Sequence, residues 1–420
     1  MRPEGLTARW LAIDPWMRTA LGLYLVLTVA TCARSALQPH RSSVFPVWKL
    51  AGHDWLTSHD LYDDKQGGDP IRFGYRYSPL VAGLFTTCDL VPERLGNVVW
   101  RIFNIAAFLA ALGWWLNKGL PFECSQLQRG LILLMAAPLA LGSLNNGQVN
   151  LLLIALMLAA VTACGVGRWN VASLCLGLAI MLKIYPVALA LLLVLVYPKR
   201  LGFRLLIALA LLAAVPFLMQ EPSYVVRQYQ LWFGRVAHGD SYRRFWPLAD
   251  SYRDVWLLIR AWEMPIDLHR YTQLQLAGGG FCAAVTLAAV LRLGQGRETL
   301  FAVLAMVTSW MLLLGPAPES CTYVLAVPTI GTWLIHTADG RNRPAHYLAA
   351  GGYGLLLLCV VAGTYSPTIR LYQASGLQPI GVILYSVGFV GTLAGRLIRP
   401  VRPAVAPGLA EIAPALSRAA

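Results

Sequence analysis

Long apolar stretches separated by short polar segments recur along the chain from Leu21 to Leu397. Crossing a bilayer about 30 Å thick takes roughly 20 apolar residues in an α-helix. The candidate spans lie at 20–36, 97–116, 128–144, 149–163, 203–219, 276–293, 299–315, 320–337, 345–363 and 379–397. The alternation of apolar and polar residues that is typical of a membrane β-strand does not occur. The pattern predicts an all-α, polytopic integral membrane protein.

Two regions depart from a regular span. Residues 78–92 contain too few apolar positions for a full crossing, whereas 169–198 is too long for one straight helix. We expect 78–92 to form a re-entrant or juxtamembrane helix that enters and leaves on the outer side. We expect the longer region to form two short spans, 170–182 and 184–197, that meet at Lys183.

Charges at the ends of the apolar stretches give the orientation. Basic residues cluster in "YPKRLGFR", "RLGQGRE", "DGRNRP" and "GRLIRPVRP", and such clusters mark cytoplasmic loops. Nearly all of them face the cytoplasm when the N-terminus is inside and 78–92 does not cross. This arrangement predicts about 12 spans with both termini in the cytoplasm. The expected organisation is one membrane domain over 1–397, with outer loops at 37–96 and 220–275, and a Pro/Ala-rich cytoplasmic tail at 398–420.

Composition agrees with a membrane protein and excludes other classes. The chain is 57% hydrophobic and 13% charged, whereas about a quarter of the residues of a soluble domain are charged. The net charge of +14 comes from basic residues at span ends and forms no basic stripe with interleaved aromatic residues, so we expect no nucleic-acid partner. Eight cysteines are scattered singly without a C-x-x-C pair, and their spacing does not suit zinc.

The remaining polar segments all fall on the outer face in this orientation. They are 37–78, "SLNNGQVN", "LKIYP", 220–275, "GPAPES" and 364–378. Because polar segments far apart in the sequence converge on one side of the membrane, we expect them to build one site there.

The segment "SLNNGQVN" contains Asn145, Asn146, Gln148 and Asn150, with Gly147 permitting a tight turn. Amides donate and accept hydrogen bonds without a buried charge, so they are suited to sugar hydroxyls. Asn and Gln also cap helices in ordinary interhelical turns. Four amides in six positions favour a binding site over a cap.

Two cationic positions indicate an anion site. Lys183 interrupts an apolar region in "MLKIYPVAL", and an ionisable residue in such a place is a functional-site hypothesis, although a lysine at a span end can snorkel. Arg76 in "GYRYSPLV" precedes a predicted helix start, where backbone N–H groups favour an anion. We expect both cations to contact phosphate and include the neighbouring Tyr77 and Tyr185 as substrate-binding candidates.

Carboxylates supply the candidate general base. Glu319 lies in "GPAPES" at the start of a predicted span, where it would cap the helix or accept a proton from a sugar hydroxyl. The outer loop 220–275 carries polar residues among Tyr, Phe and Trp, which suits sugar and phosphate recognition and equally suits a helix on the membrane surface. Its candidates are Asp240 as a second catalytic carboxylate and His238, Arg243 and Arg244 as substrate-binding residues.

The order of "DLYD…RYSPL", "NNGQVNLLLIAL", "GLAIMLKIYPVALALLLV" and "GPAPE" resembles glycosyltransferase family 87 over roughly residues 15–335. These DUF2029-type proteins are polyprenol-phosphate-mannose-dependent transferases with the GT-C fold. The resemblance implies an inverting transfer in which an acceptor hydroxyl attacks the anomeric carbon and the lipid phosphate leaves. It also implies that an outer-loop carboxylate takes the hydroxyl proton, and it carries over Asn146, Gln148 and Lys183 as site residues.

The chain departs from the family pattern in its first outer loop. The stretch "SSVFPVW" places Val44 where the family has an Asp that takes the proton. The role then passes to another carboxylate, the protein uses another donor, or it is inactive. The alternative carboxylates are Glu319, Asp54, Asp60 and Asp240.

The sequence therefore predicts a hexosyltransferase of a bacterial inner membrane that moves a sugar, expected to be mannose, from polyprenyl phosphate to a lipid or glycan acceptor. It predicts no cofactor, and no metal because no D-x-D motif appears. The runner-up is a transporter or flippase of a lipid-linked sugar, which a lysine in a broken helix also fits. An inactive family member is the third alternative. The candidate site comprises Arg76, Tyr77, Asn145, Asn146, Gln148, Lys183, Tyr185, His238, Asp240, Arg243, Arg244 and Glu319.

Overall fold

The computed structural model describes residues 13–39, 43–62, 75–238, 244–340, 342–365 and 376–398, with the backbone alone at 238 and 361–365. These residues form helices and connections, and no strand occurs among them. The all-α class predicted from the sequence is confirmed.

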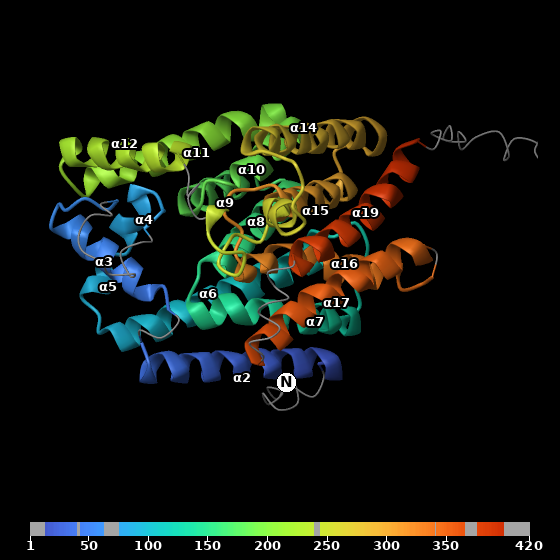
Figure 1. Ribbon diagram of the computed structural model, residues 1–420, viewed down its shortest axis with the longest axis horizontal. Helices are drawn as coiled ribbons and strands as arrows, with labels where there is room; N and C mark the ends of the chain where they lie inside the picture. Colours follow the sequence, from blue (N-terminus) through green and yellow to red (C-terminus); the bar gives the residue numbers. More distant parts are fainter. Residues whose placement is uncertain are drawn as a thin grey trace, which may run out of the picture.

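The α-helices follow the apolar stretches of the sequence (Figure 1). They are α2 (Pro15–Leu37), α3 (Phe45–Leu56), α4 (Pro79–Leu84), α5 (Thr86–Asp89), α6 (Glu93–Lys118), α7 (Gln126–Asn146), α8 (Asn150–Gly165), α9 (Trp169–Leu182), α10 (Val187–Val196), α11 (Phe203–Ala214), α12 (Pro222–His238), α13 (Val255–Ala261), α14 (Leu268–Leu293), α15 (Arg297–Leu313), α16 (Val327–Thr337), α17 (Arg343–Tyr365) and α19 (Leu377–Ile398). A π-helix η2 (Pro198–Gly202) and two 3₁₀-helices, η3 (Val215–Leu218) and η5 (Ser320–Ala326), complete the described elements.

Six helical segments of the described chain are long and apolar enough to cross a membrane. They are Pro15–Leu37, Glu93–Lys118, Gln126–Asn146, Pro198–Leu218, Leu268–Leu293 and Leu377–Ile398, and α8, α9 and α10 are shorter apolar helices. The polytopic membrane class is therefore confirmed. The number of 12 spans, the orientation of the termini and the division into a domain and a tail stay predictions. Helices α4 and α5 have 6 and 4 residues, which is far too short for a crossing.

Two predicted spans are less regular than expected, and proline accounts for both. The span predicted at 203–219 ends in the 3₁₀-helix η3, which contains Pro216. The span predicted at 320–337 begins with the 3₁₀-helix η5 and becomes α-helical only at Val327, one residue before Pro328. Proline lacks an N–H group and is favoured in the first turn of a helix, which fits the start of a new helical segment at each of these positions.

Helix α8 lies at the centre of the bundle. Most of its residues are buried, and it packs against α6, α9, α15 and η5. Helix α2 packs across α6 and α7, and α17 packs along α19. The last pair approaches closely, because a Cβ atom added at Gly352 would lie 2.3 Å from the carbonyl oxygen of Gly381. Small residues permit such backbone contact between membrane helices.

The short helices α3, α4 and α5 gather with α12 at one end of the molecule, on the left of Figure 1. An aromatic cluster holds them together, because the indole of Trp48 lies 4.6 Å from the ring of Phe85 and 4.0 Å from that of Tyr77. Aromatic pairs at these separations add to the stability that burial provides. The cluster fixes the connection that carries Tyr77 and its neighbour Arg76.

Candidate functional site

The turn between α7 and α8 presents the predicted amides. Helix α7 ends at Asn146, and Gly147 follows in the left-handed region with φ +63°, which favours glycine. The N–H of Gln148 donates to the carbonyl oxygen of Ser143 at 2.9 Å. Asn150 begins α8. The turn therefore places Gln148 just before, and Asn150 at, the first residue of the buried helix α8.

A continuous series of hydrogen bonds runs from the lysine to the glutamate. The Nζ atom of Lys183 donates to Oδ1 of Asn150 at 2.9 Å. The amide of Asn150 donates to Oε1 of Gln148 at 3.3 Å. The amide of Gln148 in turn donates to a carboxylate oxygen of Glu319 at 2.8 Å. We call these four residues the polar chain, and it unites three segments that are far apart in the sequence.

The break between α9 and α10 places Lys183 at one end of the polar chain. Lys183 adopts an extended conformation after Leu182, and α10 starts after Pro186. Its ammonium lies 5.6 Å from the centre of the Tyr185 ring. Burial lowers the pKa of Lys183, while the carboxylate of Glu319 opposes the shift. The buried hydroxyl of Tyr185 has no hydrogen-bond partner, so an added anion would meet both a cation and a free donor here.

The connection that carries Arg76 and Tyr77 is fastened to the same place. The N–H of Ser78 donates to the carbonyl oxygen of Met181 at 3.2 Å. Ser78 occupies the N-cap position of α4, but its buried hydroxyl makes no capping bond. An Nη atom of Arg76 donates to the hydroxyl of Tyr252 at 3.2 Å. Burial raises the pKa of Tyr77, and the negative charge of Glu319 adds to the effect.

Glu319 occupies the N-cap position of η5. Its N–H donates to Oγ1 of Thr322 at 3.1 Å, while its carboxylate accepts from the amide of Gln148. Two residues earlier, Ala317 has φ +55°, a conformation that costs a non-glycine residue free energy and is often found at functional sites. Glu319 therefore occupies an N-cap position and also contacts Gln148, a predicted site residue.

A cavity of about 530 Å³, lined by both polar and apolar residues, opens beside Glu319, and we call it the polar cavity because of the charged, amide and hydroxyl groups in its wall. The amide-bearing residues Asn145 and Asn146 line it from α7. The remaining lining residues come from α2, the 249–253 segment, η5 and α17, together with other positions on α7: Arg34, Leu139, Leu141, Gly142, Ala249, Asp250, Ser251, Arg253, Ser320, Cys321, Cys359 and Val360. The cavity offers hydroxyl, amide and charged groups next to a carboxylate, which suits a polyhydroxylated ligand.

An apolar groove of about 400 Å³ approaches the opposite end of the polar chain. It lies among α4, α6, α8 and α9 and is lined by Leu80, Val81, Leu84, Phe85, Cys88, Trp100, Phe103, Leu152, Leu156, Leu178, Met181 and Leu182. Leu182 directly precedes Lys183, and Leu80 follows Ser78 by two positions. The groove therefore leads from the apolar surface of the helices to the cationic end of the site.

Arg101 is a site residue that the sequence analysis missed. It lies on α6, is only 1% exposed, and donates to the carbonyl oxygen of Asn145 and to Oδ1 of Asn97, both at 2.7 Å. Arg34 donates to the side-chain oxygen of Asn145. Arg101 thus holds the amide turn in place. The sequence does hold a clue to this role, because Arg101 lies inside the apolar stretch 97–116, and a charged residue in a membrane span usually has a function.

Val44 lies at the site even though its side chain is apolar. Its N–H donates to the carbonyl oxygen of Asn146 at 2.9 Å, so the position where the family pattern has an Asp adjoins the amide turn. Of the alternative carboxylates in this loop, Asp60 pairs with Arg227 at 2.6 Å and accepts from Gln228 at 2.9 Å. Asp54 lies on α3. Glu319, in contrast, is itself a member of the polar chain.

The site residues predicted in the second outer loop do not join the polar chain among the residues that the structure describes. His238 ends α12, and its side chain is not described. Asp240 and Arg243 lie outside the described residues. Arg244 is turned inward, with Nη1 3.5 Å from a carboxylate oxygen of Asp254. Burial raises the pKa of Asp254, and the charge of Arg244 opposes this shift.

The described residues contain no group of three or more His, Cys, Asp and Glu side chains that could hold a metal ion. Lys183 and Arg76 supply cationic side chains at the site, and the buried hydroxyls of Tyr185 and Ser78 have no hydrogen-bond partner. The independence from metals and cofactors that the sequence predicts stays a prediction.

Comparisons with known proteins indicate a family. The sequence model of glycosyltransferase family 87 matches residues 75–316. A curated relative from Mycolicibacterium smegmatis, the polyprenol-phosphate-mannose-dependent alpha-(1-2)-phosphatidylinositol pentamannoside mannosyltransferase, is 28% identical over 310 residues, which cover 71% of this chain and 70% of the relative. Among solved structures, ArnT from Cupriavidus metallidurans bound to undecaprenyl phosphate covers 88% of this chain and 78% of its own, with 14% identity and a TM-score of 0.35. That structural likeness is too weak to support an inference.

Proposed function

The chain belongs to glycosyltransferase family 87, and from this membership we propose that it transfers mannose from a polyprenyl-phosphate donor to a lipid or glycan acceptor. The reaction takes place at the extracytoplasmic face of a bacterial inner membrane. The observation that carries the proposal is the polar chain, which joins Lys183 to Glu319 between an apolar groove and a polar cavity. The name of the mycobacterial relative supports the choice of donor.

The donor enters through the groove with its isoprenoid tail among apolar side chains. Within the bilayer the tail exchanges lipid contacts for contacts with the groove, so its affinity comes from non-directional van der Waals packing against the groove walls. The phosphate stops where the groove meets Lys183, and Arg76 completes the cationic end. The free hydroxyls of Tyr185 and Ser78 donate to phosphate oxygens. Hydrogen bonds from charged donors to phosphate are short and strong.

The acceptor occupies the polar cavity with one hydroxyl directed at Glu319. The carboxylate takes the hydroxyl proton as the oxygen forms a bond to the anomeric carbon, and the bond from that carbon to the phosphate oxygen breaks. Negative charge thereby moves onto the departing lipid phosphate next to Lys183. Cations already in place at the developing charge lower the barrier, because the site does not have to reorganise during the reaction.

The two amides of the polar chain hold its charged ends apart without adding charge. Gln148 leaves Glu319 as a carboxylate that still accepts a proton, because an amide donates a hydrogen bond without transferring its proton. Asn150 is fully buried and uses its oxygen for Lys183 and its nitrogen for Gln148. An unmade hydrogen bond at such a buried group is costly, so Asn150 holds Lys183 and Gln148 in place together.

The direct test uses purified protein in liposomes that contain polyprenyl-phosphate mannose labelled in the sugar. Appearance of the label in a new glycan or lipid product, with release of polyprenyl phosphate, is the expected result. Label that changes leaflet without joining an acceptor would identify a transporter and contradict the proposal. Liposomes without protein, and liposomes with the Glu319→Gln variant, are the matched controls.

The groove assignment predicts a dependence on donor chain length. Replacing Leu178 in the groove wall by Trp fills part of the groove, and we expect a KM about tenfold higher for a long polyprenyl donor. This corresponds to the loss of about 1.4 kcal/mol of apolar contact. A donor with a two-isoprene tail should show no such change. KM values for both donors provide the measurement.

The matched control is Leu191→Trp on α10, because Leu191 is 63% exposed and does not line the groove. It should leave both KM values near those of the unmodified protein. Equal increases for the long and short donors with Leu178→Trp would show that the groove does not hold the tail.

A further inference from the structure

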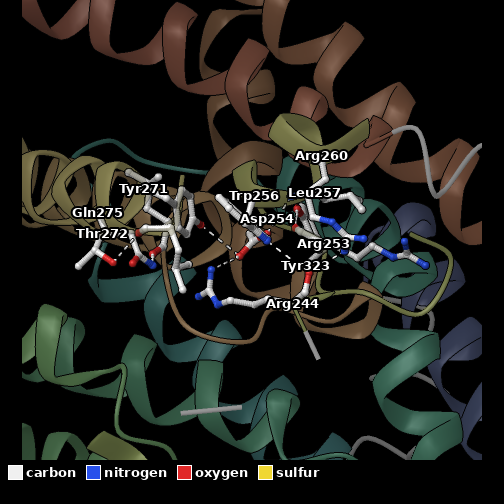
Figure 2. Close-up of polar contacts among 12 residues, drawn as sticks. Arg244, Arg253, Asp254, Trp256, Leu257, Arg260, Tyr271, Thr272, Gln275 and Tyr323 are labelled. Carbon is white, nitrogen blue, oxygen red and sulfur yellow. Dashed lines mark hydrogen bonds and ion pairs between the residues drawn. The ribbon is translucent and has the colours of Figure 1, made fainter. Parts of the chain in front are cut away.

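Asp254 is the centre of a buried polar cluster outside the polar chain (Figure 2). It is 0% exposed and accepts from the hydroxyl of Tyr271 at 3.1 Å and from the N–H of Leu257 at 3.2 Å. Arg244 pairs with it at 3.5 Å and lies 5.1 Å above the ring of Tyr271. A buried carboxylate needs such partners, and here they come from three separate segments of the chain.

The residue before Asp254 connects this cluster to the segment of Glu319. The N–H of Arg253 donates to the carbonyl oxygen of Pro318 at 2.8 Å. The carbonyl oxygen of Arg253 accepts from the hydroxyl of Tyr323. The main chain of one residue is therefore held on both sides by residues 318 and 323, which flank Glu319, and Figure 2 shows Tyr323 beside Arg253.

The side chain of Arg253 extends the connection to the cavity wall. It donates to the carbonyl oxygens of Leu248 at 2.9 Å and Ala249 at 2.5 Å. Ala249, with the two residues that follow it, lines the same cavity as Glu319. A shift of the 248–254 segment would thus move the wall of the cavity and the turn of Glu319 together.

The turn of Glu319 depends on this support. Ala317 has φ +55°, and a non-glycine residue keeps such a conformation only when the surrounding structure imposes it. Pro318 follows Ala317, and its carbonyl oxygen accepts a hydrogen bond from the N–H of Arg253, which restrains the turn. Asp254 directly follows the residue that donates this bond, so the partners that hold Asp254 also restrain Arg253 and, through it, the turn that carries Glu319.

We propose that Asp254, held by Tyr271 and Arg244, is a positioning residue that sets the place of Glu319 through the main chain of Arg253. The inference rests on the proposed role of Glu319 as the base. Asp254 itself makes no contact with the substrate, because its side chain is fully buried. Its contribution lies in the geometry of proton transfer, where a displacement of about 1 Å costs about a hundredfold in rate.

Tyr271→Phe tests the inference, since it removes one hydrogen bond to Asp254 and keeps the ring. We expect kcat for mannose transfer to fall about 10- to 100-fold, with the KM for the donor unchanged, because the donor site lies at the other end of the polar chain. Asp254→Asn should lower kcat in the same way. An unchanged kcat in Tyr271→Phe, with a lowered melting temperature, would show a purely structural role and overturn the inference.

The matched control is Tyr197→Phe, which removes another tyrosine hydrogen bond, to the carbonyl oxygen of Gln295 at 2.5 Å. Tyr197 lies between α10 and η2 and away from Glu319. It should leave kcat within about twofold of the unmodified protein, as expected for a distant and independent position. A loss as large as that of Tyr271→Phe would overturn the inference, because any lost tyrosine bond would then have the same effect.

A double-mutant cycle separates this inference from the proposed function. If Tyr271 acts through Glu319, adding Tyr271→Phe to Glu319→Gln produces no further loss of kcat. Multiplied losses would overturn the positioning role while leaving Glu319 as the base. If Glu319→Gln alone leaves transfer intact, the proposed base role fails first and the positioning inference fails with it.

Discussion

Glu319→Gln is expected to lower kcat for mannose transfer by about 10²–10⁴-fold, the range over which a general base contributes. Glutamine keeps the size of the side chain but cannot accept the hydroxyl proton. The loss corresponds to about 3–5 kcal/mol in the barrier. The KM for the donor should change little, since the donor phosphate lies at the lysine end of the polar chain. Initial rates with labelled polyprenyl-phosphate mannose supply both constants.

Two further variants test whether the loss is specific to the carboxylate of Glu319. Glu298→Gln removes a glutamate that forms an exposed ion pair with Arg396, and such pairs contribute at most about 1 kcal/mol to stability, so transfer should continue. Glu319→Asp keeps the carboxylate but shortens its reach, and it should retain more activity than the glutamine variant. Equal rates for the glutamine variant and the unmodified protein would remove Glu319 from the mechanism and direct the search to the undescribed Asp240.

Lys183→Met is expected to lower kcat/KM by about a hundredfold. Methionine keeps most of the length and apolar volume of the lysine while it removes the charge that faces the leaving phosphate. The loss corresponds to about 3 kcal/mol of transition-state stabilisation, which is typical of charge-assisted hydrogen bonds in a water-excluded site. Inhibition by added polyprenyl phosphate, the released product, should weaken in parallel. Steady-state rates and inhibition constants provide the measurement.

Lys118→Met is the matched control, because Lys118 is exposed at the last residue of α6. We expect kcat/KM within about twofold of the unmodified protein, as for surface substitutions in general. If Lys183→Met left product inhibition unchanged while transfer fell, the lysine would act only by holding Asn150 and not by contacting phosphate.

The sequence predicted most of the fold because membrane helices follow directly from apolar length. The ten long stretches and the divided region around Lys183 all correspond to described helices, with ends within a few residues in most cases. The exceptions are the 3₁₀-helices η3 and η5, and helix α14, which begins at Leu268, eight residues before the predicted span 276–293. Propensity and hydropathy alone could not fix these boundaries, because tertiary contacts and proline positions decide them.

The candidate site was predicted less completely. Amide content led to Gln148, an isolated lysine to Lys183, and a carboxylate at the start of a predicted span to Glu319; hydrogen bonds join the three through Asn150. Asn150 was noted as one of four amides but was not among the predicted site residues, and Arg101 was counted only as part of a predicted span. The roles of these two depend on packing between helices that are far apart in the sequence, and a single sequence does not encode such proximity in a local pattern.

The left-handed backbone at Ala317 has a consequence for how this protein can evolve. Glycine, and to a lesser degree asparagine, adopts that conformation at low cost, whereas valine or isoleucine does not. The main-chain conformation is therefore expected to restrict which residues this position accepts, although its side chain makes no contact with the polar chain. Because Glu319, the proposed base, lies two residues away, a residue that cannot adopt this conformation is expected to lower activity in a protein that still inserts and folds.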